Sequence, residues 1–221
     1  MRKAFVRRDE QPVGAYAPTH TQHNARRPTM NEVTYAGSIW RRGDKTLLTP
    51  IEKTDLPFFQ VAVNNAEVQR FIIVNWPLSE VGQLEWFERI SRPNPNKFTV
   101  GIRLLDGTLI GNMSLEIDEG RQSGKTGTLI GTTAHRGQGY GTDAKLTLLR
   151  YAFHERGLRR VDSPIIGYNR RSRKYAKACG YEFVYRNPGV HFRFGKWRSE
   201  VLYTAWRERW LKFERALRPS K

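Results

Sequence analysis

The segment AHRGQGYGTDAKLTLLRYAF, residues 134–153, places three glycines within five positions directly before an amphipathic helical pattern. Gly137, Gly139 and Gly141 carry no side chains, so the main chain can approach an anion closely there. The first N–H groups of the following helix would point at that anion, with the helix dipole behind them. The segment therefore predicts a phosphate-binding turn between a strand and a helix.

The spacing of these glycines separates the turn from two common phosphate-binding motifs. A dinucleotide fingerprint has the pattern G-x-G-x-x-G with an acidic residue on the next strand, whereas this chain has G-x-G-x-G past its middle. A P-loop needs G-x-x-x-x-G-K-[ST], which the sequence lacks. On its own, the segment also fits an ordinary glycine turn.

The composition is typical of one folded domain in a reducing compartment. The 221 residues are 38% hydrophobic, which is enough for one core. Cys179 is the single cysteine, so an intrachain disulfide and a Cys-rich metal site are excluded, and no metal site is expected. No apolar run approaches the roughly 20 residues of a membrane helix. We therefore expect a cytoplasmic protein with no membrane partner.

The net charge of +17 indicates attraction to polyanions such as nucleic acid or a phosphate-rich cofactor, although a solvated arginine-rich surface explains the same number. Residues 1–30 show neither helical nor strand periodicity and are rich in polar residues and proline. We expect them to form a disordered basic extension. Residues 31–221 are expected to form a single domain that includes a C-terminal helix.

Periodicity and turn signals in residues 31–221 predict a mixed α/β protein of about seven strands and five helices. Two strand-like runs meet at Asp106-Gly107, the signal of a tight hairpin turn. A helix is expected between Asn169 and Gly180, which are suited to its start and its end. Near the C-terminus, four apolar residues are spaced for one face of a helix and are expected to dock on the core: Trp206, Trp210, Phe213 and Leu217.

Three segments in order and spacing resemble the GCN5-related N-acetyltransferases (the GNAT superfamily), specifically its RimJ/RimL-like branch. They are HRGQGYGTDAKLTLLRYAF, NRRSRKYAKACGYEF and HFRFGKWRSEVLYTAWRERW, and the resemblance covers about residues 44 to 212. In the third segment, Glu200 stands at the acidic position of the family's closing hairpin. The resemblance implies the GNAT fold, a strongly twisted mixed sheet split at its fourth and fifth strands, with helices on both faces.

The resemblance also implies acetyl-CoA as the cofactor and indicates which residues hold it. The backbone of Leu129, Ile130 and Gly131, at the end of the splayed fourth strand, would pair with the pantetheine amides and hold the thioester carbonyl. Asn169 would hold the pantetheine arm from the other side, and a helix N-cap role fits this residue equally well. The pyrophosphate would be held, through main-chain N–H groups, by Arg136, Gly137, Gln138, Gly139, Tyr140, Gly141 and Thr142.

Two positions depart from the family's catalytic pattern. Many relatives carry a glutamate two residues before the glycine of the fourth strand, where this chain has Lys125 before Gly127. Many also carry a tyrosine seven residues after the asparagine, whereas position 176 is alanine and Tyr175 is one residue early. A one-residue shift turns a side chain by about 100° around a helix.

Acetyl transfer to an amine still needs a base, because amines are mostly protonated near pH 7. Glu116 and Asp118 lie on one face of the preceding strand, and Glu116 is our prediction for the base, in a buried site that raises its pKa. Ser172 and Tyr175 are candidates on the helix that faces the thiol, and His135 adjoins the loop. Each also has an ordinary structural interpretation, as an exposed strand face, a capping hydroxyl, a core residue or a solvated loop side chain.

We therefore expect an acetyl-CoA-dependent N-acetyltransferase that works by direct transfer in a ternary complex. The acceptor would be a primary amine, either a protein N-terminus or a small molecule, and the basic surface favours an amine on an anionic partner. The alternative is a catalytically weak acetyl-CoA-binding or nucleic-acid-associated module on the same scaffold. A homodimer is the further assembly that we considered.

Overall fold

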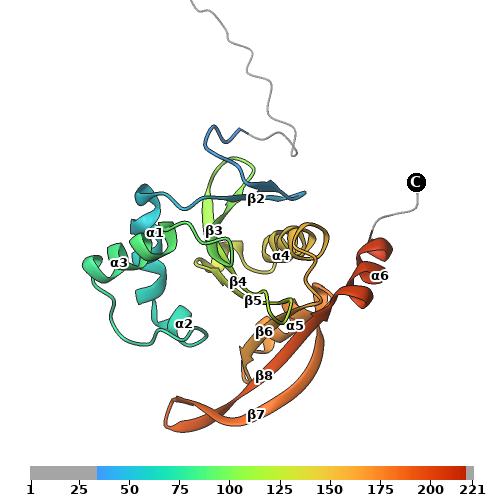
Figure 1. Cartoon of the computed structure of the whole chain (residues 1–221). Helices are drawn as coiled ribbons and strands as arrows, with labels where there is room; N and C mark the ends of the chain where they lie inside the picture. The colour runs from blue at the N-terminus through green and yellow to red at the C-terminus, as the bar shows by residue number, and fades with distance from the viewer. Residues whose placement is uncertain (1–33, 218–221) are drawn as a thin grey trace, which may run out of the picture.

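A sheet of eight strands in the order β1-β2-β3-β4-β5-β6-β8-β7 organises the protein. The computed structural model describes residues 34–217 (Figure 1). The strands are β1 (Arg41–Arg42), β2 (Thr46–Thr49), β3 (Lys97–Leu104), β4 (Leu109–Asp118), β5 (Ser123–Ile130), β6 (Arg160–Ile166), β7 (Glu182–Arg193) and β8 (Lys196–Trp206). The helices are α1 (Leu56–Asn64), α2 (Ala66–Gln69), α3 (Glu80–Ser91), α4 (Tyr140–Arg150), α5 (Arg170–Ala178) and α6 (Arg207–Leu217).

The first half of the sheet, β1 to β5, is an antiparallel meander. β3 and β4 meet at the predicted Asp106-Gly107 turn, where Gly107 has a φ of 92° that favours glycine. β4 and β5 form a second long hairpin. The predicted mixed α/β class is confirmed, and the two-residue β1 accounts for one strand more than expected.

The two halves of the sheet meet at a short parallel joint. β5 and β6 pair at only three positions, from Ser123↔Arg160 to Lys125↔Asp162. Beyond Lys125 the strands separate, so the remainder of β5 has no partner strand on that side. When β1 is left out of the count, these are the fourth and fifth strands, as predicted. The second half, β6-β8-β7, is antiparallel.

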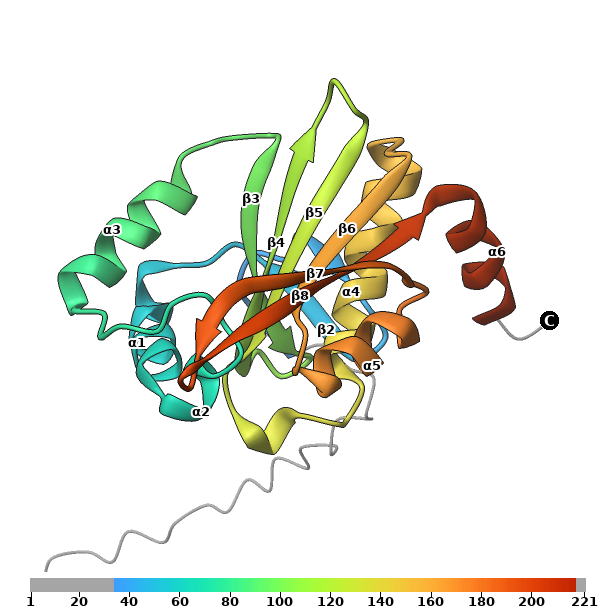
Figure 2. The same cartoon turned by 90° about the horizontal axis from the view of Figure 1, so that it is seen from below.

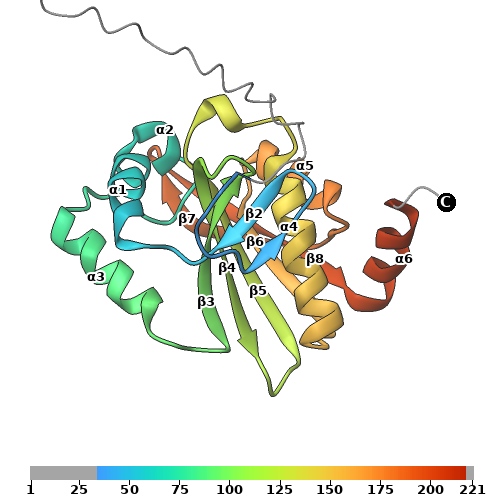
Figure 3. The same cartoon turned by 90° about the horizontal axis from the view of Figure 1, so that it is seen from above.

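The faces of the sheet are covered by different elements. α4 lies against one face, and the β7–β8 hairpin crosses the opposite face (Figures 2 and 3). α1, α2 and α3 lie together beside β3 (Figure 3). The predicted apolar stripe is completely buried. Ala144, Leu148 and Leu149 lie on α4, and Ala152 lies on the π-helical turn Tyr151–Glu155 that continues it.

The C-terminal helix α6 docks on the core through a shorter stripe than predicted. Trp210 is fully buried, and its indole N–H donates to the Cys179 carbonyl at 3.0 Å. Trp206 instead ends β8, where it pairs in register with Arg160, so the chain is still extended there. Leu217 at the other end is 46% exposed. The prediction was therefore wrong for Trp206 and Leu217.

The predicted basic extension, residues 1–30, lies outside the described residues and stays a prediction. Within residues 34–217, every helix is too short or too polar to cross a membrane.

Trp210→Ala should lower the free energy of unfolding by about 3–5 kcal/mol, because it removes a fully buried indole. Leu217→Ala on the same helix should cost far less, about 0.5 kcal/mol, since that residue is 46% exposed. Urea denaturation followed by far-UV circular dichroism measures both. Equal losses would show that α6 docks by a different face.

Candidate functional site

The glycine turn before α4 presents a row of free main-chain donors. Gly137 and Gly139 have φ values of 79° and 85°, and Gly139 is the N-cap of α4. In the part of the chain that the structure describes, no protein acceptor binds the backbone N–H groups from Gly137 to Thr142. Six adjacent donors at a helix N-terminus make a site suited to phosphate oxygens.

Asp143 fixes the surroundings of this turn. Its carboxylate accepts hydrogen bonds from the backbone N–H groups of Asp44 at 2.9 Å and Lys45 at 3.0 Å, and from the Thr46 hydroxyl at 2.6 Å. These bonds hold the β1–β2 turn against the start of α4. The Lys45 ammonium therefore lies at the glycine turn, 3.5 Å from the Gln138 carbonyl. Neither Asp143 nor Lys45 was predicted from the sequence, because the two residues are 98 positions apart.

The end of β5 adjoins the glycine turn, as predicted for Leu129, Ile130 and Gly131. These residues are partly buried, and Arg136 donates to the Ile130 carbonyl at 3.3 Å. Burial, reinforced by the nearby charge of Arg171, lowers the pKa of Arg136, which still leaves it charged near neutrality. His135, on the intervening 3-10 turn, shares a 2.7 Å hydrogen bond with the Thr132 hydroxyl.

The start of α5 lies across the split from β5. Asn169 is 7% exposed and caps α5, because its carbonyl oxygen accepts from the backbone N–H of Ser172 at 3.0 Å. The N-cap interpretation is therefore confirmed. Tyr175 reaches from α5 to β5, where its hydroxyl is 3.2 Å from that of Thr128. Burial raises the pKa of Tyr175, so it is a protonated donor.

A buried lysine that was not predicted from the sequence lies under the site. Lys145 is 2% exposed, and its ammonium is 5.9 Å from the ring centroid of Tyr175 and 5.8 Å from that of Tyr181. Burial lowers the pKa of Lys145 to about 8. The available signal was its place on the buried stripe of α4, one residue after Ala144. Burial also raises the pKa of Cys179 to about 12, so this thiol is not a nucleophile near neutrality.

The two predicted acids on β4 lie toward the closed end of the split. Glu116 pairs in register with Lys125, whereas Asn112 pairs with Leu129, about 13 Å further along the strand. The Glu116 side chain is 57% exposed and binds Lys97 at 3.3 Å, so the expected burial was wrong. Asp118 ends the strand, and hydrogen bonds from Arg121 lower its pKa. The catalytic assignment of both stays a prediction.

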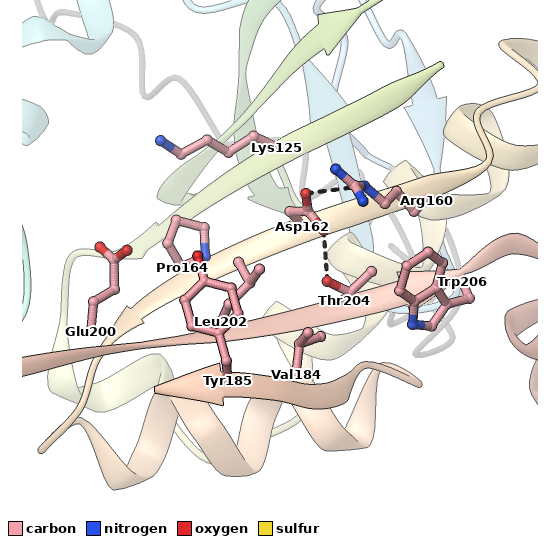
Figure 4. A pocket seen from close by; sticks show the side chains of 10 residues that line it. All are labelled: Lys125, Arg160, Asp162, Pro164, Val184, Tyr185, Glu200, Leu202, Thr204 and Trp206. Atoms are coloured by element: carbon pink, nitrogen blue, oxygen red, sulfur yellow. Dashed lines mark hydrogen bonds and ion pairs between the residues drawn. The ribbon is translucent and has the colours of Figure 1, made fainter. Parts of the chain in front are cut away.

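A cavity of about 430 Å³ lies where the β7–β8 hairpin borders the split (Figure 4). Thr126 and Thr128 turn their hydroxyls to the tyrosines on the α5 side of β5, so Lys125, one residue along, faces the opposite side. The cavity is therefore separated from the glycine turn by the sheet. Its walls come from four strands, β5 to β8, and include Lys125, Arg160, Asp162, Tyr185, Glu200 and Trp206.

Glu200 stands at the end of the cavity nearest the opening of the split. Its register partner Ile166 is four residues beyond Asp162, just as Leu129 is four residues beyond Lys125. Glu200 is therefore level with the predicted cofactor-holding end of β5. Its side chain is 30% exposed, and its carboxylate is 3.2 Å from the imidazole of His191. The sequence marked Glu200 only as a motif position, because the β6–β8 register is a long-range property.

Comparison with known proteins agrees with this geometry. A family model described as an acetyltransferase (GNAT) domain matches residues 45–182, which is more than half of the chain. The chain belongs to the GNAT acetyltransferase family. Membership of this family makes the protein an N-acetyltransferase. The match identifies the family and does not assign the RimJ/RimL-like branch. No curated protein gives a significant match to this GNAT sequence.

Solved GNAT structures share the fold at low sequence identity. An acetyltransferase from Bacillus anthracis is 16% identical, with a TM-score of 0.68 over 76% of this chain and 98% of that one. Spermidine N-acetyltransferase from Vibrio cholerae, solved with CoA and spermine, is 18% identical, with a TM-score of 0.69 over 75% and 98%. The microcin C7 self-immunity acetyltransferase MccE, solved with acetyl-CoA and AMP, is 17% identical, with a TM-score of 0.65 over 74% and 93%.

Gly139→Val should weaken CoA binding on the order of 100-fold, because two or more charge-assisted hydrogen bonds from the turn would be lost. Gly157→Val is the matched control, since Gly157 also has a positive φ, of 62°, with nothing within 4 Å of an added Cβ. Titration calorimetry should give native affinity for this control. Equal affinities for the two variants would exclude the turn as the phosphate site.

Proposed function

We propose that this GNAT acetyltransferase moves an acetyl group from acetyl-CoA to a primary amine by direct transfer. The observation that carries the proposal is the split between β5 and β6. One side of it carries the free N–H groups before α4, and the other carries the cavity in which Glu200 is level with Leu129. Two substrates could therefore meet through the split without sharing a pocket.

The residues around the split fit the cofactor. The N–H groups from Gly137 to Thr142, with Lys45 beside them, suit the pyrophosphate. The unpaired edge at Leu129, Ile130 and Gly131 suits the pantetheine amides, because it offers main-chain groups like those of a neighbouring strand. Asn169, across the split, retains its amide N–H₂ as a donor. Acetyl-CoA supplies the activated acetyl group when bound.

Glu200 is the proposed base for the acceptor. An amine is mostly protonated near pH 7, so a carboxylate that accepts its proton, directly or through one water, frees the attacking lone pair. Glu200 is an acid of the cavity at the level of Leu129, and the bond with His191 holds it in place. Tyr175 is the proposed proton donor on the other side of β5, and Ser172, one turn earlier, remains the second candidate.

The proposed acceptor is a primary amine. Spermidine N-acetyltransferase was solved with spermine, a polycation, and MccE with AMP, a phosphate compound. In this chain residues 159–217 contain 15 Lys and Arg against 5 Asp and Glu, while residues 34–158 contain 15 against 13. The positive charge is thus concentrated in β6, α5, β7, β8 and α6, and Arg160 of this segment lines the cavity together with Lys125. This distribution favours an acceptor that is anionic or carried on an anionic partner.

The same charge distribution supports the alternative function, a nucleic-acid-associated module with little catalysis. Steady-state release of CoA with a panel of amines separates the two functions. Turnover that requires an amine supports the enzyme, whereas CoA binding with no turnover and tight RNA binding supports the module.

Direct transfer predicts intersecting lines in initial-velocity plots, because both substrates must be bound before either product leaves. Cys179→Ala should keep kcat within about twofold, since a thiol with a pKa of about 12 forms no acyl intermediate near neutrality. Parallel lines, together with loss of activity in the cysteine variant, would instead indicate a covalent route.

Glu200→Gln should lower kcat on the order of 100-fold and leave CoA affinity unchanged, because it removes the base and not the phosphate site. The deficit should shrink as the pH rises, since the amine then loses its proton without help. Glu116→Gln, measured beside it, tests the base predicted from the sequence. A loss confined to the Glu116 variant would assign proton removal to β4.

A further inference from the structure

We infer that Lys125 selects an acceptor that carries an anionic group, a carboxylate or a phosphate, close to its amine. This inference rests on the proposed function and names the substrate class of the same cavity. It follows from the pairing of the charges across the sheet, from the direction of the Lys125 side chain and from the position of Glu200.

Lys125 stands in a row of charged side chains across the sheet. The register pairs Lys97 with Glu116, Glu116 with Lys125, and Lys125 with Asp162. Directly opposite residues share a face, so a lysine between two acids should be neutralised. Both acids are instead held by other partners. Glu116 binds Lys97 at 3.3 Å, and Asp162 accepts from the Thr204 hydroxyl at 2.7 Å and lies 3.5 Å from the guanidinium of Arg160.

The Lys125 ammonium is consequently free to meet a ligand. Across residues 34–217, no carboxylate comes within ion-pair distance of it. Figure 4 shows the side chain lying along β5, with its ammonium directed toward the end of the cavity where Glu200 lies. Glu200 in turn binds His191 and not Lys125. One cavity therefore presents a free cation and an anion that do not neutralise each other.

These two charges match a small molecule that carries both an ammonium group and an anionic group. The acceptor's ammonium would meet Glu200, where its proton is removed, and its anionic group would meet Lys125 in a charge-assisted hydrogen bond. A polyamine would place a second cation against Lys125, and this repulsion disfavours it. The volume of about 430 Å³ suits a small molecule or the end residue of a chain.

The test uses acceptors matched in everything except the anionic group. An amino acid is compared with its carboxamide, and phosphoethanolamine with ethanolamine, by kcat/KM with saturating acetyl-CoA. The protein should prefer the anionic member of at least one pair by about tenfold or more, as expected for one charge-assisted contact. The pair with the larger ratio identifies the anionic group as carboxylate or phosphate. Raising the salt concentration should reduce the ratio, since partly exposed charges are screened.

Variants assign the preference to this side chain. Lys125→Met should raise the KM for the anionic acceptor about tenfold, with kcat and the kinetics of the uncharged acceptor nearly unchanged. Lys125→Arg should retain the preference because it keeps the charge. Lys212→Met is the matched control, since Lys212 is an exposed lysine of α6 that does not line the cavity. Thermal melting checks that each variant is folded.

The outcomes distinguish failure of this inference from failure of the proposed acetyl transfer. Equal use of both members of each pair, or a preference that survives in Lys125→Met, overturns the role of Lys125 and leaves acetyl transfer standing. Absence of turnover with every amine, despite CoA binding, contradicts the proposed function. Calorimetric titration of the same acceptor pairs into the CoA-loaded protein then decides the inference by affinity. A tighter anionic member that needs Lys125 supports it, and equal affinities overturn it.

Discussion

The pairing of β5 with β6 ends after three residues, and the rest of the site depends on that separation. Buried backbone groups need hydrogen-bond partners, so a strand edge left open inside a domain is a place for a ligand. The elements that follow each strand return to the same opening. The glycine turn after β5 begins α4, and Asn169 after β6 begins α5. Two helix N-termini therefore lie at the same opening. This arrangement brings together the free N–H groups of the glycine turn, the amide of Asn169 and the open edge of β5.

The alternation of side chains along β5 divides the work between its two faces. Thr126 and Thr128 point to the tyrosines of the α5 side, whereas Lys125 points to the cavity bordered by the β7–β8 hairpin. A single strand thus separates a buried, hydroxyl-lined side from a charged, partly solvated one. A proton donor on one side and a proton acceptor on the other can then have different environments, which is a general requirement for acid and base groups that work in the same reaction.

Features set by nearby residues were predictable from the sequence, and those set by register were not. The glycine turn, the Asp106-Gly107 hairpin and the buried stripe of α4 each depend on neighbours within a few positions. Glu116 was expected to be buried, but its environment is decided by lysines on two other strands, one of them 19 residues earlier. Trp206 satisfied the helical spacing, yet pairing with Arg160 keeps it in β8. Glu200 could be named as a motif position, but its alignment with Leu129 follows from the β6–β8 register, which the sequence alone does not reveal.

The shortness of the parallel joint also has a consequence for the folding thermodynamics of the domain. Tight hairpins join β3, β4 and β5, and β2 pairs with β3 along its whole length across the segment that holds α1 to α3. In contrast, β5 joins β6 after a crossover of some 30 residues through only three register pairs, so few ladder bonds repay that loop closure. The joint therefore couples the unfolding of the two halves only weakly. A molecule bound along the open edge would take the place of a missing strand between them. Because binding to the native state lowers its free energy by RT ln(1 + [L]/Kd), the resistance of the chain to opening and to proteolysis rises with the concentration of its ligand.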